Sequence, residues 1–524
     1  MTTLEPWALS LISVGALLVA MYVVSLILQK WAQKRYHYLK SHPPTACDID
    51  AFVGPSYPPK HLKVCLVHQA STGGAAQMAD NAGNRVIPLE VVKSPHVPGL
   101  WVSQKLGTTK DAKPVEEVLQ APGKKPIIIG TIRMGFGHHR LAYSAASWAV
   151  QNGYPCIFHD LLNIDSPESD LIKSTDEMYS KWSRRASELG GVVERLWGAM
   201  MKAGDADALR VAALTASLLQ PLLKAYPKDS CIITSHQLVA LTAAAAGFTN
   251  VVNLVVDNHP QWFLTVPKTV NLVQGPVNYQ VFAKMGVSFK ELEWAGHWCP
   301  YQMVSNIPTD CQRRLERVKA SKPLRILIPV GGAGAQRKFI VAFVRALAPL
   351  VKDGKVQLFL NAGDHAHMKS AFLEVLDACS LRFDTVKDTK GVMDFQSKLL
   401  TASNEPSSNV TLFTFDEYFP AVATTDILCR VSDVLACKPS ELAFYCVPKL
   451  HIRRVGDHEA DSACRSSELG DGTVEAREVP DAMAFVDLFL KSPDMLVSMN
   501  EAIIRNGSMG LYDGCKKAVE LVAK

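Results

Sequence analysis

Residues 126–140 read PIIIGTIRMGFGHHR. An apolar run ends at glycines, two adjacent histidines follow, and an alanine-rich segment with helical spacing comes next. This order predicts a buried strand, a glycine turn and the first turn of a helix, which together gather backbone N–H groups at one point. Such a point favours anions such as phosphates, and the histidines add groups that titrate near neutral pH.

A second copy of this layout follows about 200 residues later. Leu324 to Val330 is an apolar run, Gly331 to Ala335 a glycine turn, and Lys338 to Val351 a helical pattern. Two such units predict two α/β domains whose parallel sheets face each other across a cleft. Ligands of open α/β sheets bind at the carboxyl ends of the strands, so the cleft is the expected site.

Apolar runs alternate with helical patterns through both halves, which is typical of parallel sheets covered on both faces. We expect Rossmann-like, doubly wound domains at 125–305 and 320–495, and a C-terminal helical segment at 496–524 that packs back on the first domain. The expected strands are Ile127–Ile129, Pro155–Phe158, Cys231–Thr234, Val251–Val256, Val270–Val273, Leu324–Val330, Val356–Leu360, Val410–Phe413, Ile427–Cys429 and Lys449–Ile452.

The N-terminal part contains an uncharged, mostly apolar run at 7–28. As a helix it would be about 33 Å long, enough to span the hydrocarbon core of a bilayer. Lysines and arginines follow the run and none precede it, so the positive-inside rule places the bulk of the chain in the cytosol. A cleaved signal peptide is the weaker alternative because the first residues lack Lys and Arg. Residues 29–124 read as a Pro/Gly-rich linker or a small subdomain.

The formal net charge of +5 over 524 residues is small, and it argues against a dedicated nucleic-acid-binding protein. The twelve cysteines form no CxxC pair. With a cytosolic orientation they are expected to be reduced and buried, and no zinc site is expected.

Polar residues at two strand ends of the first half are candidate catalytic groups. His138 and His139 lie at the first glycine turn, although they could also serve only to cap the helix. Asp257 and His259 follow the apolar run Val251 to Val256, where either could act as a base towards an acceptor hydroxyl. The structural alternative for this second pair is an ordinary turn.

The second half holds the candidate binding residues. Its glycine turn allows a phosphate to approach the backbone closely. Ser440 and Glu441 precede an apolar helix, where a carboxylate can accept both hydroxyls of a ribose or simply favour the helix start. A loop that contains His458 and Glu459 could hold sugar hydroxyls or be a solvated loop. The candidates are Gly331, Gly332, Gly334, Arg430, Lys438, Ser440, Glu441, His458 and Glu459.

Taken in order, these motifs resemble glycosyltransferase family 28, over roughly residues 125–475. The turn at 137–140 is similar to the family's glycine-rich GGH turn, and residues 259–263 look like the HPTWF stretch of its galactolipid synthases. The turn at 331–335 matches the GGxxG turn of the donor domain. Ser440-Glu441 matches the family's ribose-binding SE, and residues 458–461 resemble its QEAGN-like sugar loop.

The resemblance implies a GT-B fold on an N-terminal transmembrane helix, with an acceptor domain followed by a nucleotide-sugar domain. It implies transfer of a hexose from a nucleotide sugar of the UDP-linked kind to a lipid or lipid-linked acceptor at a membrane. Arg430 or Lys438 would neutralise phosphate charge, since no DxD-type metal motif occurs in the expected donor domain at 320–495. No cofactor beyond the donor is implied.

The sequence also departs from the family pattern. The first turn carries two histidines, the run before Ser440 lacks glycine, and His458 replaces the usual glutamine. Two alternatives therefore stand beside the transferase. One is an inactive GT-B binding or scaffold protein at a membrane, and the other is a different GT-B nucleotide-sugar enzyme.

Overall fold

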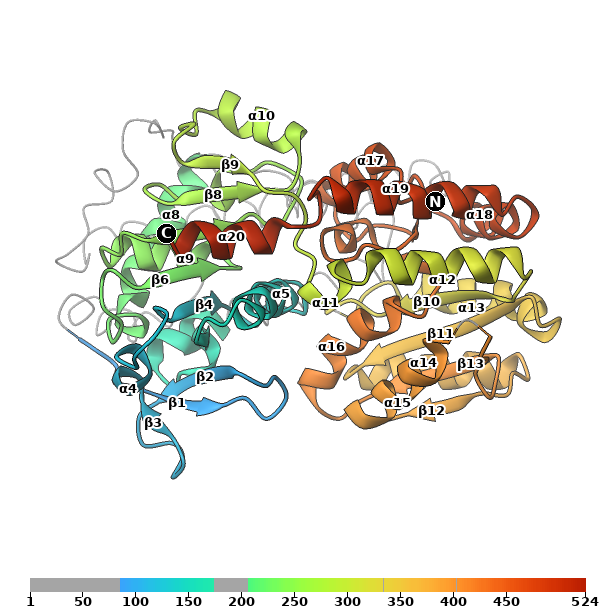
Figure 1. Ribbon diagram of the computed structural model, residues 1–524, viewed down its shortest axis with the longest axis horizontal. Helices are drawn as coiled ribbons and strands as arrows, with labels where there is room; N and C mark the ends of the chain where they lie inside the picture. The colour runs from blue at the N-terminus through green and yellow to red at the C-terminus, as the bar shows by residue number, and fades with distance from the viewer. Residues whose placement is uncertain (1–84, 174–205, 333, 402) are drawn as a thin grey trace, which may run out of the picture.

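The computed structural model describes residues 85–173, 206–332, 334–401 and 403–524. They form two α/β domains that lie side by side (Figure 1). One domain is built on a nine-stranded sheet and the other on a six-stranded sheet. Two Rossmann-like domains in this arrangement are the architecture expected for a GT-B fold.

The first sheet has the order β3-β1-β2-β5-β4-β6-β7-β8-β9, and its strands from β2 to β9 pair in parallel. Nearly every residue of the central strands is buried, as expected for a parallel sheet covered on both faces. The strands are β1 (Leu89–Lys93), β2 (Leu100–Lys105), β3 (Lys113–Pro114), β4 (Ile127–Thr131), β5 (Cys156–Asp160), β6 (Cys231–Thr234), β7 (Val251–Leu254), β8 (Val270–Val273) and β9 (Leu292–Trp294).

Residues 85–119 do not form the linker or separate subdomain that the sequence predicted. β1 pairs antiparallel with β2 and β3, and β2 pairs in parallel with β5, so this segment extends the first sheet. The reason lies in the short strands LEVVK and LWVSQK, whose buried side chains join the core of the first domain. The Pro and Gly residues fall mainly in the connections around them.

Helices cover both faces of the first sheet. Side chains from α5 (Gly137–Gln151) and α20 (Gly514–Val522) pack with Ile127 and Ile129 of β4 on one face. Side chains from α8 (Ala206–Leu219) and α9 (Gln237–Ala245) pack with Ile128 on the other. The alternation along β4 follows from the two-residue period of a strand. α4 (Val115–Leu119) and α10 (Pro276–Met285) lie at the edges of this domain (Figure 1).

The second sheet is entirely parallel, in the order β12-β13-β11-β10-β14-β15. Its strands are β10 (Leu324–Pro329), β11 (Val356–Gly363), β12 (Asp384–Val386), β13 (Val410–Thr414), β14 (Val434–Cys437) and β15 (Lys449–His451). The expected strand Ile427–Cys429 is wrong, because these residues end helix α16 (Tyr418–Cys429). The strand of this segment is β14, a few residues further along the chain. The apolar pattern could not distinguish the two, because a buried helix and a buried strand are both continuously apolar here.

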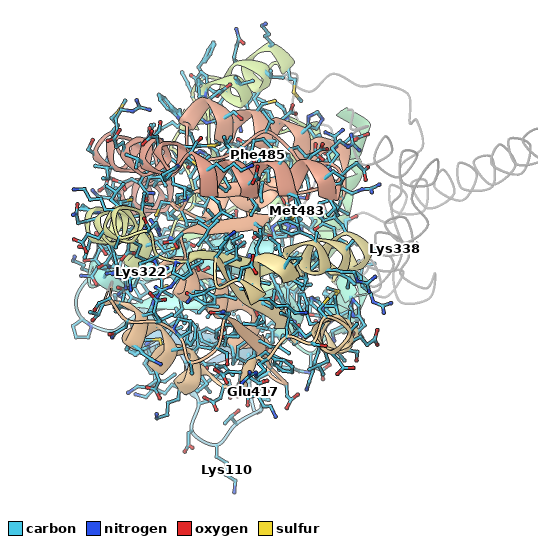
Figure 2. All side chains as sticks on the ribbon, turned by 90° about the vertical axis from the view of Figure 1, so that its right-hand side faces the viewer. Lys110, Lys322, Lys338, Glu417, Met483 and Phe485 are labelled. Carbon is cyan, nitrogen blue, oxygen red and sulfur yellow. The ribbon has the colours of Figure 1, made fainter. Side chains whose placement is uncertain are left out.

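The helices of the second domain also divide between two faces. α13 (Arg337–Lys352), α14 (Ala366–Ala378) and α18 (Val479–Lys491) share one core with Ile326 and Ile328. α15 (Thr389–Leu399) and α16 pack with Leu327 on the other face. Figure 2 looks onto this domain, with Lys338 near the start of α13 and Met483 and Phe485 on α18.

The chain crosses between the domains twice. The first crossing leads through α11 (Tyr301–Val304) to α12 (Ile307–Lys319), and the second leads from α19 (Asp494–Ser508) to α20. The crossings pair with each other, since the His297 N–H donates to the Leu511 carbonyl at 2.8 Å. α20 then lies against α5, β6 and β7 of the first domain (Figure 1). One hydrophobic cluster thus runs through both domains.

The predicted membrane-spanning segment 7–28 lies outside the described residues. Among the residues that are described, no helix is both long and apolar enough to cross a bilayer.

The docking of α20 gives a stability prediction. Val519 of α20 is buried against the first domain, whereas the adjacent Glu520 is exposed. Val519→Ala should lower the free energy of unfolding by about 1–3 kcal/mol, because buried apolar area and packing are lost. Glu520→Ala should leave it nearly unchanged. Equal effects of the two variants in denaturant melts would contradict the docked position of α20.

Candidate functional site

The strand order of the first sheet reverses between β4 and β6, which makes the crevice between their carboxyl ends the preferred ligand position. The loops after these two strands are joined there. The Ser235 hydroxyl donates to the Thr131 hydroxyl at 2.7 Å, and the His138 ring contacts the Ser235 carbonyl. The sequence motif at 126–140 therefore reaches the switch point of its own sheet.

His138 has the geometry of a general base. Its Nδ1 lies 2.6 Å from the Ser235 carbonyl oxygen, and a carbonyl can only accept, so Nδ1 carries the proton. Nε2 is then the basic nitrogen of the neutral ring. Burial lowers the pKa of His138 below its ordinary value, although the Ser235 carbonyl and Asp257 oppose this shift. The ring is therefore neutral, and able to accept a proton, at physiological pH.

His236 is a residue that the sequence analysis missed. It caps α9, where its Nδ1 accepts the Leu238 N–H at 3.1 Å, and its ring centre lies 4.3 Å from that of His138. Burial and His138 lower the pKa of His236 well below its ordinary value. The signal in the sequence was its place two residues after the apolar strand Cys231–Thr234, which is similar to the position of Asp257 after β7.

His139 is separated from this group. Its Nε2 lies 3.0 Å from Asp160 Oδ2, and aromatic rings from both domains surround it, among them Phe158 and Tyr418. Burial would raise the pKa of Asp160, but His139 and two backbone N–H groups lower it below its ordinary value. The carboxylate therefore stays charged and holds the imidazole. Of the two adjacent histidines, His138 lies at the switch point, whereas His139 is held by Asp160 among aromatic rings of both domains.

The loop after β7 meets the second domain. His259 Nδ1 lies 2.5 Å from Asp461 Oδ2, at the start of α17 (Ala460–Leu469). The neighbouring Asn258 donates to the Ser462 hydroxyl at 3.3 Å. Asp257 is half-buried and acts electrostatically on His138. Asp257 therefore belongs with the first switch point, whereas His259 joins the first domain to the predicted sugar loop.

The second sheet has its own switch point, between β10 and β14. The glycine turn follows β10, and Lys438 follows β14. The Lys438 side chain passes over this turn, since a Cβ on Gly331 would lie 3.3 Å from Lys438 Cε. A cation thus lies against the glycine turn that precedes the N-terminus of α13.

Lys438, Ser440 and Glu459 form one hydrogen-bonded cluster. Lys438 Nζ donates to Glu459 Oε1 and to the Ser440 hydroxyl, both at 2.7 Å, and the Ser440 hydroxyl donates to the same carboxylate oxygen at 2.9 Å. Burial would raise the pKa of Glu459, but Lys438, His458 and the Val455 N–H hold it at about 2. Glu459 is therefore a permanent anion at the second switch point.

Two further histidines hold the glycine turn, and the sequence analysis named neither. The His365 ring donates through Nε2 to the Gly331 carbonyl at 3.1 Å, and the His367 ring donates to the Gly334 carbonyl at 2.9 Å. A Cβ on Gly334 would lie only 2.5 Å from His367 Cε1, which explains the glycine. Both histidines follow β11, so the tertiary fold and not the local sequence brings them to the turn.

The two glycine turns touch. A Cβ on Gly332 would lie 2.1 Å from the Phe136 backbone nitrogen, and the Tyr418 hydroxyl donates to the Gly135 carbonyl at 3.2 Å. The Phe136 and His365 rings are 5.5 Å apart. The carboxyl edges of the two sheets therefore face each other, as the repeated motif predicted, but the two turns are in direct contact where a cleft was expected.

Glu441, the candidate ribose ligand, lies at the domain interface. It belongs to the short helix η4 (Pro439–Phe444), and its Oε2 accepts from Arg140 Nη1 at 2.7 Å. Both side chains are nearly fully buried. The Gly-His-His-Arg turn thus contributes an arginine to the second domain, which the sequence analysis did not foresee.

Of the remaining two candidates, Arg430 lies apart from the cluster of Lys438, Ser440 and Glu459, whereas His458 is adjacent to it. The structure does not bring Arg430 to the site. It precedes β14, at the opposite edge of the sheet from the glycine turn, and pairs with Asp310 at 2.9 Å. Its expected role towards phosphate has no geometric basis, because it lies before β14 and not after it. His458 precedes Glu459 in the short helix η5 (Asp457–Glu459), with its ring close to Gly456.

Two family models without an assigned function each match part of the chain. Residues 287–523 match the model described as Domain of unknown function (DUF6938), and residues 78–284 match Domain of unknown function (DUF6937). No curated protein matches the chain in sequence.

Several solved structures of nucleotide-sugar proteins are similar at low identity. UDP-GlcNAc 2-epimerase from Neisseria meningitidis, bound to UDP-GlcNAc, is 11% identical with a TM-score of 0.43, and the match covers 75% of this chain and 98% of that one. Anabaena Alr3699/HepE in complex with UDP is 9% identical with a TM-score of 0.38, covering 76% and 98%. This similarity is too distant to transfer a ligand or an activity.

The contact between the turns predicts opposite effects for one glycine from each turn. Gly332→Ala should lower the free energy of unfolding by about 1–3 kcal/mol, because its methyl group would collide with backbone that cannot easily move. Gly137→Ala should be neutral or stabilising by up to about 1 kcal/mol, because Gly137 begins α5 and a Cβ there meets nothing closer than 3.9 Å. Thermal melts of both variants test this, and unchanged stability of Gly332→Ala would refute the contact.

Proposed function

We propose that this chain is a nucleotide-sugar-dependent enzyme that transfers a hexose from a UDP-linked donor to an acceptor hydroxyl. The observation that carries the proposal is the direct apposition of two sheet switch points. One presents a neutral histidine with a basic Nε2, and the other presents a glycine turn with a lysine beside it.

The donor is proposed to bind on the second domain. Its diphosphate would lie at the turn Gly331 to Gly334, near the start of α13 and Lys438, where a helix N-terminus and a cation both favour negative charge. Glu441 would accept the ribose hydroxyls. Glu459 and His458 would face the hexose, since a fixed carboxylate orients hydroxyl donors.

The acceptor is proposed to approach on the first domain. His138 Nε2 would take the proton from the acceptor hydroxyl while the oxygen of that hydroxyl forms a bond to the anomeric carbon of the donor hexose. The bond from that carbon to the diphosphate breaks, and UDP leaves with the bonding electrons. Asp257 supports this role because its charge stabilises the imidazolium that forms. The apolar run 7–28 supports a lipid or lipid-linked acceptor, which could not leave the bilayer.

A binding protein without catalysis is the second candidate. The tight contact at Gly332 favours it, because the backbone of Phe136 lies beside the turn where a donor diphosphate would need room. UDP binding without release of UDP from any UDP-hexose, over a broad set of acceptors, would support this candidate over the transferase.

The donor site predicts a specific loss of UDP affinity. Lys438→Gln keeps donors for Ser440 and Glu459 but removes the charge, so the Kd for UDP should rise about 10–100-fold, as expected for one charged hydrogen bond. Lys390→Gln is the matched control, because Lys390 is an exposed lysine of the same domain that pairs only locally with Asp394. Isothermal titration calorimetry measures both. Failure of the unaltered chain to bind UDP would overturn the proposed function.

The proposed base predicts a rate effect and a pH profile. His138→Asn retains a donor for the Ser235 carbonyl but cannot accept a proton, so UDP release from a UDP-hexose with acceptor should slow about 10²–10⁴-fold. His96→Asn, at an exposed histidine, should have little effect. Because burial lowers the pKa of His138, the rate of the unaltered chain should fall only as the pH drops below 6.5. A rate for His138→Asn equal to that of the unaltered chain would exclude this base.

A further inference from the structure

Arg140 reaches from the first domain into the second and is nearly fully buried there. Besides its bond to Glu441, its Nη2 donates to the Val422 carbonyl at 3.5 Å, and its Nε lies 3.7 Å from Asp426 Oδ1. The guanidinium also lies 5.3 Å from the centre of the Tyr445 ring. One cation of α5 thus faces two carboxylates of the other domain.

Arg140 does not contact the two carboxylates equally. Glu441 has the short contact, whereas Asp426 Oδ1 and Arg140 Nε are both buried and too far apart for a hydrogen bond. A small shift of the guanidinium could close the gap to Asp426 and weaken the bond to Glu441. Asp426 is therefore placed to compete with Glu441 for one arginine.

We propose that Arg140 is a positioning residue of the donor site, which holds Glu441 towards the ribose from the opposite domain, and that Asp426 competes with Glu441 for it. This inference rests on the proposed function, because it assumes that Glu441 accepts the ribose hydroxyls. Oε2 of Glu441 is taken by Arg140, and the other oxygen is left to face the ribose.

The arrangement couples nucleotide binding to the contact between the domains. Arg140 is on α5 and Glu441 is on η4, so Glu441 is held only when the two domains meet. A ligand that needs an oriented Glu441 therefore binds the form in which the two domains are in contact better than a form in which they are apart. This difference in affinity shifts the population towards the form with the domains in contact. The sequence places Arg140 directly beside the histidines of the first turn, so the same helix start serves both the base and the donor ligand.

Competition by Asp426 depends on its charge. Burial raises the pKa of Asp426 to about 7, with Glu441 adding to the shift while Arg140 and Tyr445 oppose it. The charged or titratable groups that face it are Arg140 of α5, Glu441 and Tyr445 of the η4 segment, and Cys429 of its own helix. Its side chain is 22% exposed, so solvent can deliver and remove the proton. Below about pH 7 Asp426 is neutral and does not compete, so Arg140 pairs with Glu441 alone.

The experiment is calorimetric titration of the full chain with UDP and with 2′,3′-dideoxy-UDP, which lacks the ribose hydroxyls. Arg140→Lys keeps the positive charge but loses the planar guanidinium, which donates to Glu441 and to the Val422 carbonyl at once. The Kd for UDP should therefore rise about 10-fold, while the Kd for the dideoxy nucleotide changes little. Arg345→Lys, at an exposed arginine of α13, is the control. A merely structural role for Arg140 would weaken both nucleotides equally, and that result would overturn the inference.

A pH series tests the competitor. UDP affinity of the unaltered chain should decline as the pH rises through 7, and Asp426→Asn should remove this decline. The Asp426→Asn variant can also be tested without ligand, through the pH dependence of its free energy of unfolding. Because the pKa of Asp426 is raised in the folded state, the folded chain loses stability as the pH rises from about 4 to about 7, and Asp426→Asn should lose less. Identical pH profiles of the two proteins in both measurements would overturn the competition.

The outcomes separate this inference from the proposed function. If the unaltered chain binds no UDP, the proposed function fails and the positioning role fails with it. If the unaltered chain binds UDP and Arg140→Lys binds it equally well, only the present inference fails.

Discussion

The direct contact of two glycine turns is the constraint on which the rest of the structure depends. Gly332 lies so close to the backbone of Phe136 that no side chain fits between them. This distance brings Arg140 within reach of Glu441 and His259 within reach of Asp461. It also lets one hydrophobic cluster continue from the first sheet to the second. Without this approach the two domains would be separate Rossmann-like units with half a site each.

The histidines around this contact have different tasks, which their partners determine. His138 donates to a carbonyl and keeps a basic nitrogen, whereas His139 is held by a buried carboxylate. His365 and His367 donate to carbonyls of the other glycine turn and so fix its shape. Adjacent residues on one helix point to different surroundings because successive positions are about 100° apart. The identity of the residue therefore says little until its neighbours are known.

The charged groups at the second switch point and at the domain interface are arranged differently. Lys438 and Glu459 form a matched pair with short hydrogen bonds, and Glu459 remains charged. Arg140 instead faces two carboxylates and satisfies only one of them well. Buried charges are costly unless they are paired, so the second group is the one that can respond to a proton or a ligand.

The sequence by itself determined the two α/β units, most of the central strands and the repeated glycine turns, because these follow from local apolar runs and from glycine at tight turns. It also identified His138, Lys438, Ser440, Glu441 and Glu459 as residues that lie after strands, and the parallel sheets gather such residues at one edge. It misplaced Arg430 and the strand at 427–429, since a buried helix and a buried strand look alike in sequence.

Only the tertiary structure decided which histidine faces the switch point, that residues 85–119 extend the first sheet, and that Arg140 crosses to Glu441. His236, His365 and His367 likewise became site residues only through folding. The physical reason is that local patterns specify backbone conformation within a few residues. The pairing of groups hundreds of residues apart depends on how two hydrophobic surfaces meet, and no local pattern encodes that.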